Sequence, residues 1–430
     1  MPLQSLSADW IFPVSSPPLF GHALEFENGI IRALRPARGD DPKIEGACLL
    51  PGLVNAHTHL AYTALRNQFD DLAFFPWIRR LTELKYNKLT AEDLALSTRL
   101  GIYECLRAGI TTVADLSDCE SGLAELSRSP LRGIFYWEVF GVEQEHAQRT
   151  WTELQQTFPR LLKQYVTNRL RIGISPHAIF TVRPELYRRI AGWSIRENIP
   201  VSFHVAESRD EEEFVATRGG VIGKFLEKRA ADWEMLGSSS VSHLEKTGIL
   251  DTRPLLAHLV QASGEDFEIL ARHDVSVAHC PKSNAKFAHG IAPLTELRNH
   301  GLRVGLGTDS AASNNRLDLF EEGRFALLQQ RSRDHRMNLT EAEVLAMMTL
   351  DGARAMGLEE TIGSLESGKA ADFIAVTVPS YYTEADQLLR HLVHNATSMD
   401  VAGTWIAGTR VAATDPGGEI REFYRRSSLS

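Results

Sequence analysis

Long apolar stretches are missing from this sequence. No run of apolar residues is long enough to span a bilayer, and the first residues show no positive segment followed by an apolar core, so we expect neither a membrane partner nor a signal peptide. The four cysteines are scattered and form no CxxC pair, which favours a reducing compartment over a disulfide framework. We therefore predict a cytoplasmic protein.

An excess of basic residues is also missing. The 46 Lys and Arg residues are outnumbered by 55 Asp and Glu residues, which gives a formal net charge of −9. Nucleic acids and anionic membranes are bound through basic patches, so we expect no nucleic-acid partner. The content of 43% hydrophobic and 23% charged residues is typical of a globular chain with a large core.

Short apolar runs alternate with amphipathic stretches over most of the chain. This alternation predicts parallel strands joined by helices, and the apolar runs fit strands that are buried on both faces. Eight such strands form a (β/α)₈ barrel, and 430 residues leave room for a small second domain. The predicted strands cover residues 49–60, 110–116, 131–141, 170–178, 199–207, 254–260, 275–284 and 302–310.

Helices are predicted between the strands, including residues 91–108, 184–197 and 210–228. The flanks look different, because residues 8–50 and 363–412 are rich in turns and short strands and neither is large enough for a core of its own. We therefore predict that both chain ends pair into one composite β-sandwich. The predicted fold is α/β, a distorted (β/α)₈ TIM barrel at 51–362 with a β-sandwich domain built from 1–50 and 363–430.

Polar side chains recur at the ends of the predicted strands, which form the active-site face of a barrel. A buried strand has little reason to end in an imidazole or a carboxylate unless something there uses it. One such histidine is commonly structural, but its repetition on six strands favours a functional site. The side chains concerned are His57, His59, His177, His204, Glu207, His258, His279 and Asp309.

Four of these residues form a pattern of metal ligands. His57 and His59 are two residues apart on a strand, so both point to the same face. An HxH alone is a weak signal, because a strand end with ordinary hydrogen bonds gives the same pattern. Followed by His204 on the fifth strand and Asp309 on the eighth, it predicts one divalent metal. Imidazole and carboxylate together favour zinc, with iron as the alternative, over magnesium or calcium.

Other strand-end residues are candidates for catalysis and substrate binding. Glu207 could take a proton from the attacking water and pass it to the leaving group, although a solvated loop glutamate is the alternative. His258 could orient that water, and a structural histidine is the alternative. We predict that His177 contacts substrate and that His279, with Cys280, frames the pocket. We assign no role to His243, His273 and His289, which we interpret as surface or loop residues.

Several segments resemble the chlorohydrolase and deaminase branch of the amidohydrolase superfamily. These segments are PGLVNAHTHL, SFHVAE, HCPKSNAKF, GLGTDSAASNN and GSLESGKAADFIAV, and the similarity extends over nearly the whole chain. Within the branch, the sequence is similar to the S-adenosylhomocysteine and methylthioadenosine deaminases. The resemblance implies the same barrel, the same four metal ligands and a possible homo-oligomer. It implies proton transfer by Glu207 and His258, a substrate contact by His177, and an additional proton-accepting role for Asp309.

The sequence departs from the branch at several points. Binuclear relatives carry a bridging lysine or glutamate on the third or fourth strand, but Glu138 falls before the predicted strand end, so we predict one metal. Gln261 stands where relatives often have a second histidine. The loop 61–86 lacks the acidic residue that holds the ribose in adenosylhomocysteine deaminases, unless Glu83 serves. The loop also resembles the deaminases of aminofutalosine.

Three functional hypotheses follow. The first is hydrolytic deamination of an aminated N-heterocycle, such as an adenine nucleoside, with Phe74, Phe75 and Trp77 either stacking on the ring or serving as core residues. The second keeps the metal and the small heterocyclic substrate, but removes chloride or opens a cyclic amide. The third is a barrel that binds a ligand without catalysis, against which the complete set of ligands and acid–base groups argues.

Overall fold

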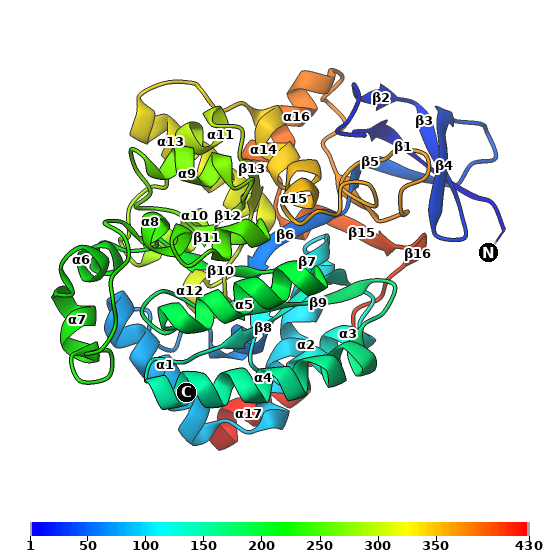
Figure 1. Cartoon of the computed structure of the whole chain (residues 1–430). Helices are drawn as coiled ribbons and strands as arrows, with labels where there is room; N and C mark the ends of the chain where they lie inside the picture. The colour runs from blue at the N-terminus through cyan, green and yellow to red at the C-terminus, as the bar shows by residue number, and fades with distance from the viewer. Residues whose placement is uncertain (1, 428–430) are drawn as a thin grey trace.

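Eight parallel strands form the centre of the molecule, as the computed structural model of residues 2–427 shows (Figure 1). They pair as two four-stranded sheets, and backbone bridges at Ile174–Val201 and Thr58–Asp309 join the sheets into a closed barrel. All eight predicted strands are confirmed. Their bounds are β6 Leu53–Thr58, β7 Ile110–Ser117, β8 Arg132–Val139, β9 Leu170–Pro176, β10 Ser202–Val205, β11 Leu255–His258, β12 Ser276–His279 and β13 Arg303–Leu306.

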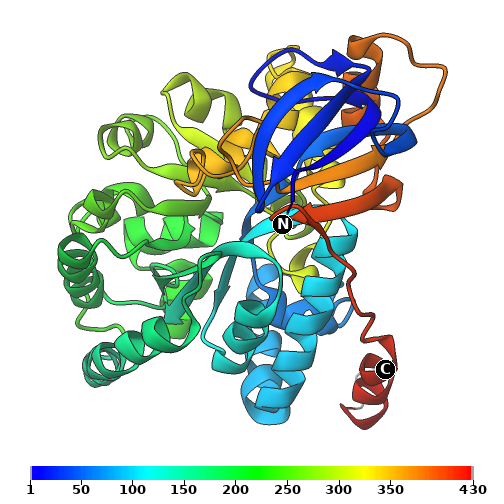
Figure 2. The same ribbon diagram turned by 90° about the vertical axis from the view of Figure 1, so that its right-hand side faces the viewer.

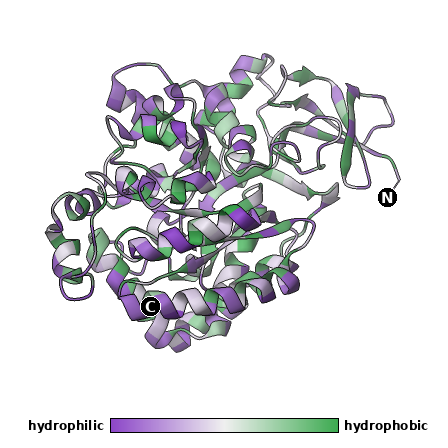
Figure 3. Cartoon of the chain, viewed as in Figure 1, coloured by the Kyte–Doolittle hydropathy of each residue, from purple (hydrophilic) through white to green (hydrophobic). Residues whose placement is uncertain are grey.

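Helices surround the barrel and carry both hydrophilic and hydrophobic residues (Figure 3), as expected where one face packs on strands. Those that follow strands β6 to β9 are η1 Leu60–Leu65, α1 Phe74–Lys88, α2 Ala91–Arg107, α3 Glu120–Arg128, α4 Gln144–Tyr165 and α5 Pro184–Glu197. The remaining ones are α6 Arg209–Thr217, α7 Gly220–Leu226, α8 Ser240–Glu245, η2 Ile249–Thr252, α9 Asp266–Arg272, α10 Pro281–Lys286, α11 Leu294–Asn299, α12 Ala311–Asn314, α13 Leu319–Asp334, α14 Glu341–Met347, α15 Leu350–Ala355, α16 Ala385–His394, η3 Ser398–Asp400 and α17 Gly417–Ser427. No helix among these described residues is long and apolar enough to cross a membrane.

The predicted helix at 210–228 is wrong, because the structure has two helices there. Helix α6 ends at Thr217, and the next residue, Arg218, adopts the left-handed conformation with φ 58°. Gly219 follows, and α7 begins at Gly220. Gly220 also has a positive φ, which interrupts a continuous helix. The break lets the chain turn, and Figure 1 shows α1, α6 and α7 together at one end of the molecule.

The two ends of the chain build a second, all-β unit. Its eight strands form one sheet in the order β16-β15-β14-β5-β1-β3-β4, with β2 paired to β1. Their bounds are β1 Gln4–Ile11, β2 Leu19–Phe20, β3 His22–Glu27, β4 Ile30–Pro36, β5 Lys43–Pro51, β14 Phe373–Thr377, β15 Val401–Ile406 and β16 Thr409–Arg410. The sheet folds back on itself, because the backbone of Ala371 bonds both Gly29 and Gly408. Figure 2 shows the blue N-terminal strands and the orange to red strands of the C-terminal part together in this unit.

Strand β5 continues directly into the first barrel strand β6. Gly52 joins them at a point where a Cβ atom would lie 2.1 Å from Thr111 Oγ1, so only glycine fits without a shift. The predicted domain limits remain a prediction, but helix α17 lies outside the β unit. Its residues Ile420 and Phe423 pack in a cluster with Trp77 and Leu81 of α1, against the barrel.

Candidate metal centre and cavity

His57 and His59 lie at the carboxyl end of β6, and both are buried. His59 Nδ1 is 2.8 Å from the carbonyl oxygen of Leu116 on β7. A carbonyl only accepts, so Nδ1 carries the proton and Nε2 presents a lone pair. Neither nitrogen of His57 has a hydrogen-bond partner among the described residues. Two imidazoles on one strand therefore offer unsatisfied nitrogen atoms.

His204, at the end of β10, completes the group. Its Nδ1 lies 2.9 Å from the carbonyl oxygen of His177, so its lone pair is also on Nε2. That Nε2 atom is 3.2 Å from Nε2 of His59. Two lone pairs at this distance repel each other unless a cation lies between them. Nitrogen atoms of all three imidazoles lie within 4.8 Å of one another, so the residues present fit a bound divalent metal.

Asp309 follows β13 and adds a carboxylate. Its Oδ1 atom is 3.5 Å from Nε2 of His59 and 3.7 Å from Nε2 of His57. Ser283 Oγ donates to the other oxygen at 2.6 Å, and the Ser310 backbone N–H donates to Oδ1 at 2.7 Å. The structure therefore brings the four predicted ligands together, and the carboxylate is fixed by two donors of its own.

The protonation of the three imidazoles suits metal binding. Burial lowers the pKa of His57 well below its usual value, and the neighbouring imidazole of His204 adds to this. Burial lowers the pKa of His59 to about 4 and also lowers the pKa of His204. All three rings are therefore neutral near pH 7, which is the form that binds metals.

The backbone at this face is held in conformations that non-glycine residues rarely adopt. Ala206, His258 and Asp309 have φ values of 50°, 76° and 56°. Each lies just after or at the end of a barrel strand, and each conformation costs of order 1–3 kcal/mol. The Asp309 N–H donates to the His57 carbonyl at 2.9 Å, and Thr58 Oγ1 donates to the Asp309 carbonyl. These two hydrogen bonds offset part of the conformational cost at Asp309. Such residues concentrate at functional sites.

Glu207 lies beside the metal ligands in the loop after β10. The carboxylate of Glu211 on α6 accepts the backbone N–H groups of Ala206 and Glu207, at 2.8 and 3.2 Å, and so fixes this loop. Oε1 of Glu207 is 3.7 Å from Nε2 of His258 and 3.4 Å from Nε2 of His289. Burial alone would raise the pKa of Glu207, but these two imidazoles outweigh it and hold the pKa below its usual value.

Asn284 ties together the two histidines that face Glu207. Its side-chain oxygen is 2.9 Å from Nδ1 of His258, and its carbonyl accepts the backbone N–H of His289 at 2.9 Å. His289 lies in a loop, which was one of the two interpretations, but it is not a surface residue, because it is buried against Phe74 and Phe287 next to Glu207. His289 does not follow a predicted strand, so the pattern that pointed to the other site residues did not include it. His243, placed in the same group, is also buried, on α8.

A cavity of about 630 Å³ opens next to the ligands, and both predicted substrate-binding residues line it. His177 Nδ1 is 2.9 Å from Thr181 Oγ1, and its ring lies 4.8 Å from that of His204. Trp77 of α1 is 4% exposed and packs on Phe287, so it is a core residue whose edge reaches the cavity. The predicted contacts of His177 and Trp77 with substrate remain predictions.

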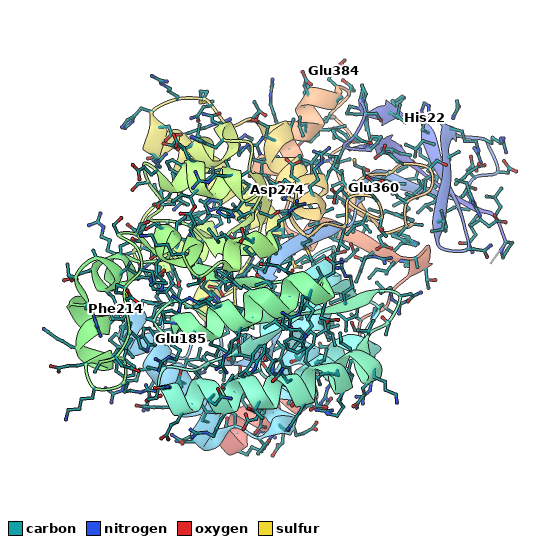
Figure 4. All side chains as sticks on the ribbon, in the orientation of Figure 1. His22, Glu185, Phe214, Asp274, Glu360 and Glu384 are labelled. Carbon is teal, nitrogen blue, oxygen red and sulfur yellow. The ribbon has the colours of Figure 1, made fainter. Side chains whose placement is uncertain are left out.

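The outer wall of the cavity is apolar. Leu226 of α7 and Phe180 line it and belong to a cluster with Trp233 and Phe214, which Figure 4 labels on α6. His279, predicted to frame the pocket, is buried on β12 and is not among the lining residues found in the described part of the chain. Glu138 was predicted to lie before the strand end. It is the penultimate residue of β8 and lines the cavity.

The chain belongs to the amidohydrolase family, which it matches over residues 48–411. The fold of that family is the TIM barrel seen here, and its members are metal-dependent hydrolases. A relative from Pelotomaculum thermopropionicum, a 5-methylthioadenosine/S-adenosylhomocysteine deaminase, is 36% identical over 378 residues, 87% of this chain and 82% of its own. A second deaminase of that name, from Moorella thermoacetica, is 32% identical over 96% of this chain and 94% of its own.

Two solved structures share the architecture of the whole chain. An adenosine deaminase from Xanthomonas campestris with bound zinc superposes with a TM-score of 0.87 at 26% identity, covering 99% of each chain. Atrazine chlorohydrolase from Arthrobacter aurescens with zinc gives 0.82 at 21% identity, covering 99% of this chain and 100% of its own. The second similarity concerns the fold alone.

Proposed function

We propose that this protein is a metal-dependent aminohydrolase that deaminates an aminated N-heterocycle, such as an adenine nucleoside. The observation that carries the proposal is the convergence of three neutral imidazoles and Asp309 next to the Glu207 carboxylate, at the floor of an apolar-walled cavity. The names of the curated relatives support deamination over dechlorination, because the chlorohydrolase is similar in fold only. Adenosine, methylthioadenosine, S-adenosylhomocysteine and aminofutalosine are the candidate substrates.

His57, His59, His204 and Asp309 would hold one divalent metal, for which we propose zinc. The metal supplies Lewis acidity, which makes water a nucleophile near neutral pH. The remaining chemistry belongs to the protein. The apolar part of the cavity wall would displace water from the faces of the bound ring.

Glu207 is a carboxylate near neutral pH, so it can accept the proton that the attacking water loses. Water adds to the ring carbon that bears the amino group, and Glu207 passes the proton to the adjacent ring nitrogen. Asp309 accepts the second water proton and returns it to the amino group. The C–N bond then breaks, ammonia leaves, and the ring carbon keeps the oxygen. His258, oriented by Asn284, positions the water and stabilises the developing charge.

The experiment is an ammonia assay on zinc-loaded protein with a panel of aminated purines, pyrimidines and triazines. We expect release from at least one adenine nucleoside. Glu207→Gln should lower kcat by about 10²- to 10⁴-fold, the usual contribution of a general acid–base group. Glu213→Gln, an exposed carboxyl on the neighbouring helix α6, is the matched control and should behave as wild type. No ammonia from any member, or chloride release from chlorinated triazines instead, would reject deamination.

We propose in addition that the protein is cytoplasmic and has no nucleic-acid partner, as its charge predicts. The possible homo-oligomer remains a prediction that size-exclusion chromatography with light scattering can test.

A further inference from the structure

One carboxyl group in the cavity has no hydrogen-bond partner among residues 2–427. Glu138 is 3% exposed and lines the cavity, and its Oε1 atom has no hydrogen bond within the described part of the chain. Leaving such a group unpaired costs about 1–3 kcal/mol. A buried unsatisfied acceptor therefore calls for a reason to be there, and a bound ligand is one.

The ammonium group of Lys85 does not satisfy Glu138. Lys85 of α1 lines the same cavity, but its ammonium group donates to the hydroxyl of Tyr62 at 2.9 Å and to the carboxylate of Asp118. Its charge is therefore matched by Asp118. Burial raises the pKa of Glu138 to about 8, and the Asp118 carboxylate adds to this. Glu138 is thus not held as an ion pair.

His177 provides a second acceptor beside Glu138. The Thr181 hydroxyl donates to the carbonyl of Ala178 at 3.0 Å, so its oxygen accepts the Nδ1 proton of His177. The Nε2 atom of His177 is left with a lone pair. Phe140 packs over this ring, with the ring centroids 4.9 Å apart. Ligand atoms of Glu138 and His177 lie within 4.8 Å of each other, in a largely apolar setting.

A second metal does not account for this pair. The third residue of the group is His204, whose Nδ1 faces a carbonyl and whose Nε2 faces His59. An imidazole has one lone pair to give, and that of His204 points to the first metal centre. Two remaining donors are fewer than the three protein ligands of catalytic zinc sites. The pair is suited instead to an organic group that donates hydrogen bonds.

We propose that Glu138 is a specificity-determining residue that, with His177, binds a hydroxyl or amine group of the substrate outside the ring that is deaminated. This inference rests on the proposed function, and it names the class of substituent that the site accepts.

The test pairs a protein change with a ligand change. Dissociation constants are measured by calorimetry on zinc-loaded protein with inosine and its 2′-, 3′- and 5′-deoxy analogues, none of which can be deaminated. The variant is Glu138→Leu, which removes both carboxyl oxygens. The matched control is Glu153→Leu, because Glu153 is an exposed carboxyl on α4 that is not among the residues lining the 630 Å³ cavity.

In wild type and Glu153→Leu, loss of one particular hydroxyl should weaken binding about tenfold, the value of one hydrogen bond to a buried acceptor. In Glu138→Leu, which has no acceptor at this point, that ratio should fall to about twofold or less. Removing an unpaired buried carboxyl should not lower the melting temperature. An unchanged ratio, no binding of any inosine, or two zinc ions in wild type and one in Glu138→Leu would overturn the inference. Ammonia release from adenosine, measured separately, tests the proposed function.

Discussion

Replacing His289 with phenylalanine isolates the role of the imidazole that sequence reasoning overlooked. The ring lies between Phe74 and Phe287, at centroid distances of 4.8 and 5.8 Å, so a phenyl ring keeps the packing and removes the two nitrogen atoms. The only catalytic contact that is lost among the described residues is the 3.4 Å approach of Nε2 to Glu207 Oε1. His289 does not line the cavity, so substrate binding should be unaffected.

The size of the effect follows from the surroundings of Glu207. Two imidazoles face its Oε1 atom, and His258 at 3.7 Å remains in the variant. Losing one polar partner of a buried charged group costs about 1–3 kcal/mol. We therefore expect kcat to fall by roughly 10- to 100-fold, or about 1.4–2.7 kcal/mol in the barrier, with KM nearly unchanged. This loss is smaller than that expected for Glu207→Gln.

The pH dependence of kcat/KM distinguishes an electrostatic role of His289 from a purely structural one, because a structural role would leave the pH dependence unchanged. His289 helps to hold the pKa of Glu207 below its usual value, so its removal raises that pKa. Glu207 acts as a base only in its carboxylate form, and activity is lost as the pH falls through its pKa. The acidic limb of kcat/KM should therefore move to higher pH in the variant. His300→Phe is the control, because His300 is an exposed imidazole stacked on Phe267. A variant that keeps more than half of kcat with the same acidic limb would refute the reasoning.

Three further outcomes are expected. Chelation of the metal should lower the melting temperature and zinc should restore it, since a ligand at 100 times its Kd stabilises by about 2.7 kcal/mol; no shift would argue against the metal centre. Asp115→Ala should lower the free energy of unfolding in urea by about 1–3 kcal/mol, because the Leu60 N–H loses its acceptor at 2.8 Å. Asp115→Asn keeps an acceptor and should cost less. Equal losses of stability in the two variants would contradict this. Burial raises the pKa of Glu322 from 4.5 to about 8, so its contribution to stability is present below pH 4.5 and is lost as the pH rises towards 8. Glu322→Gln should therefore flatten the fall in unfolding free energy between pH 5 and 8, and an unchanged slope would show that other groups cause it.

The residues that sequence reasoning placed correctly share one property, which is their position in a regular element. His57, His59 and His204 sit at or just after strand ends, and a parallel barrel brings all such ends to one face. Eight apolar runs therefore sufficed to predict both the fold and the meeting of the ligands. The predicted end of β8 lies two residues too late, at 141 instead of Val139, so the sequence did not indicate that Glu138, which precedes the strand end as predicted, lines the cavity.

The residues that were missed owe their positions to irregular backbone. His289 reaches Glu207 through the loop after α10, held by Asn284, and no periodic pattern encodes such a loop. The break between α6 and α7 combines Arg218 in a left-handed conformation, which a non-glycine residue adopts rarely, with the Gly219-Gly220 pair that follows. Tertiary contacts place His289, whereas the two glycines are a local signal for the break.

The composite sheet has a consequence for synthesis. Strand β5 leaves the ribosome early, but its neighbour β14 is made only after the whole barrel, about 330 residues later, and β15 and the edge strand β16 follow. At 5–20 residues per second this delay is roughly 16–65 s. During that time one edge of β5 has no partner strand and is open to wrong pairings. A nascent chain that stalls inside the barrel should consequently be a client of the chaperones that meet emerging polypeptides.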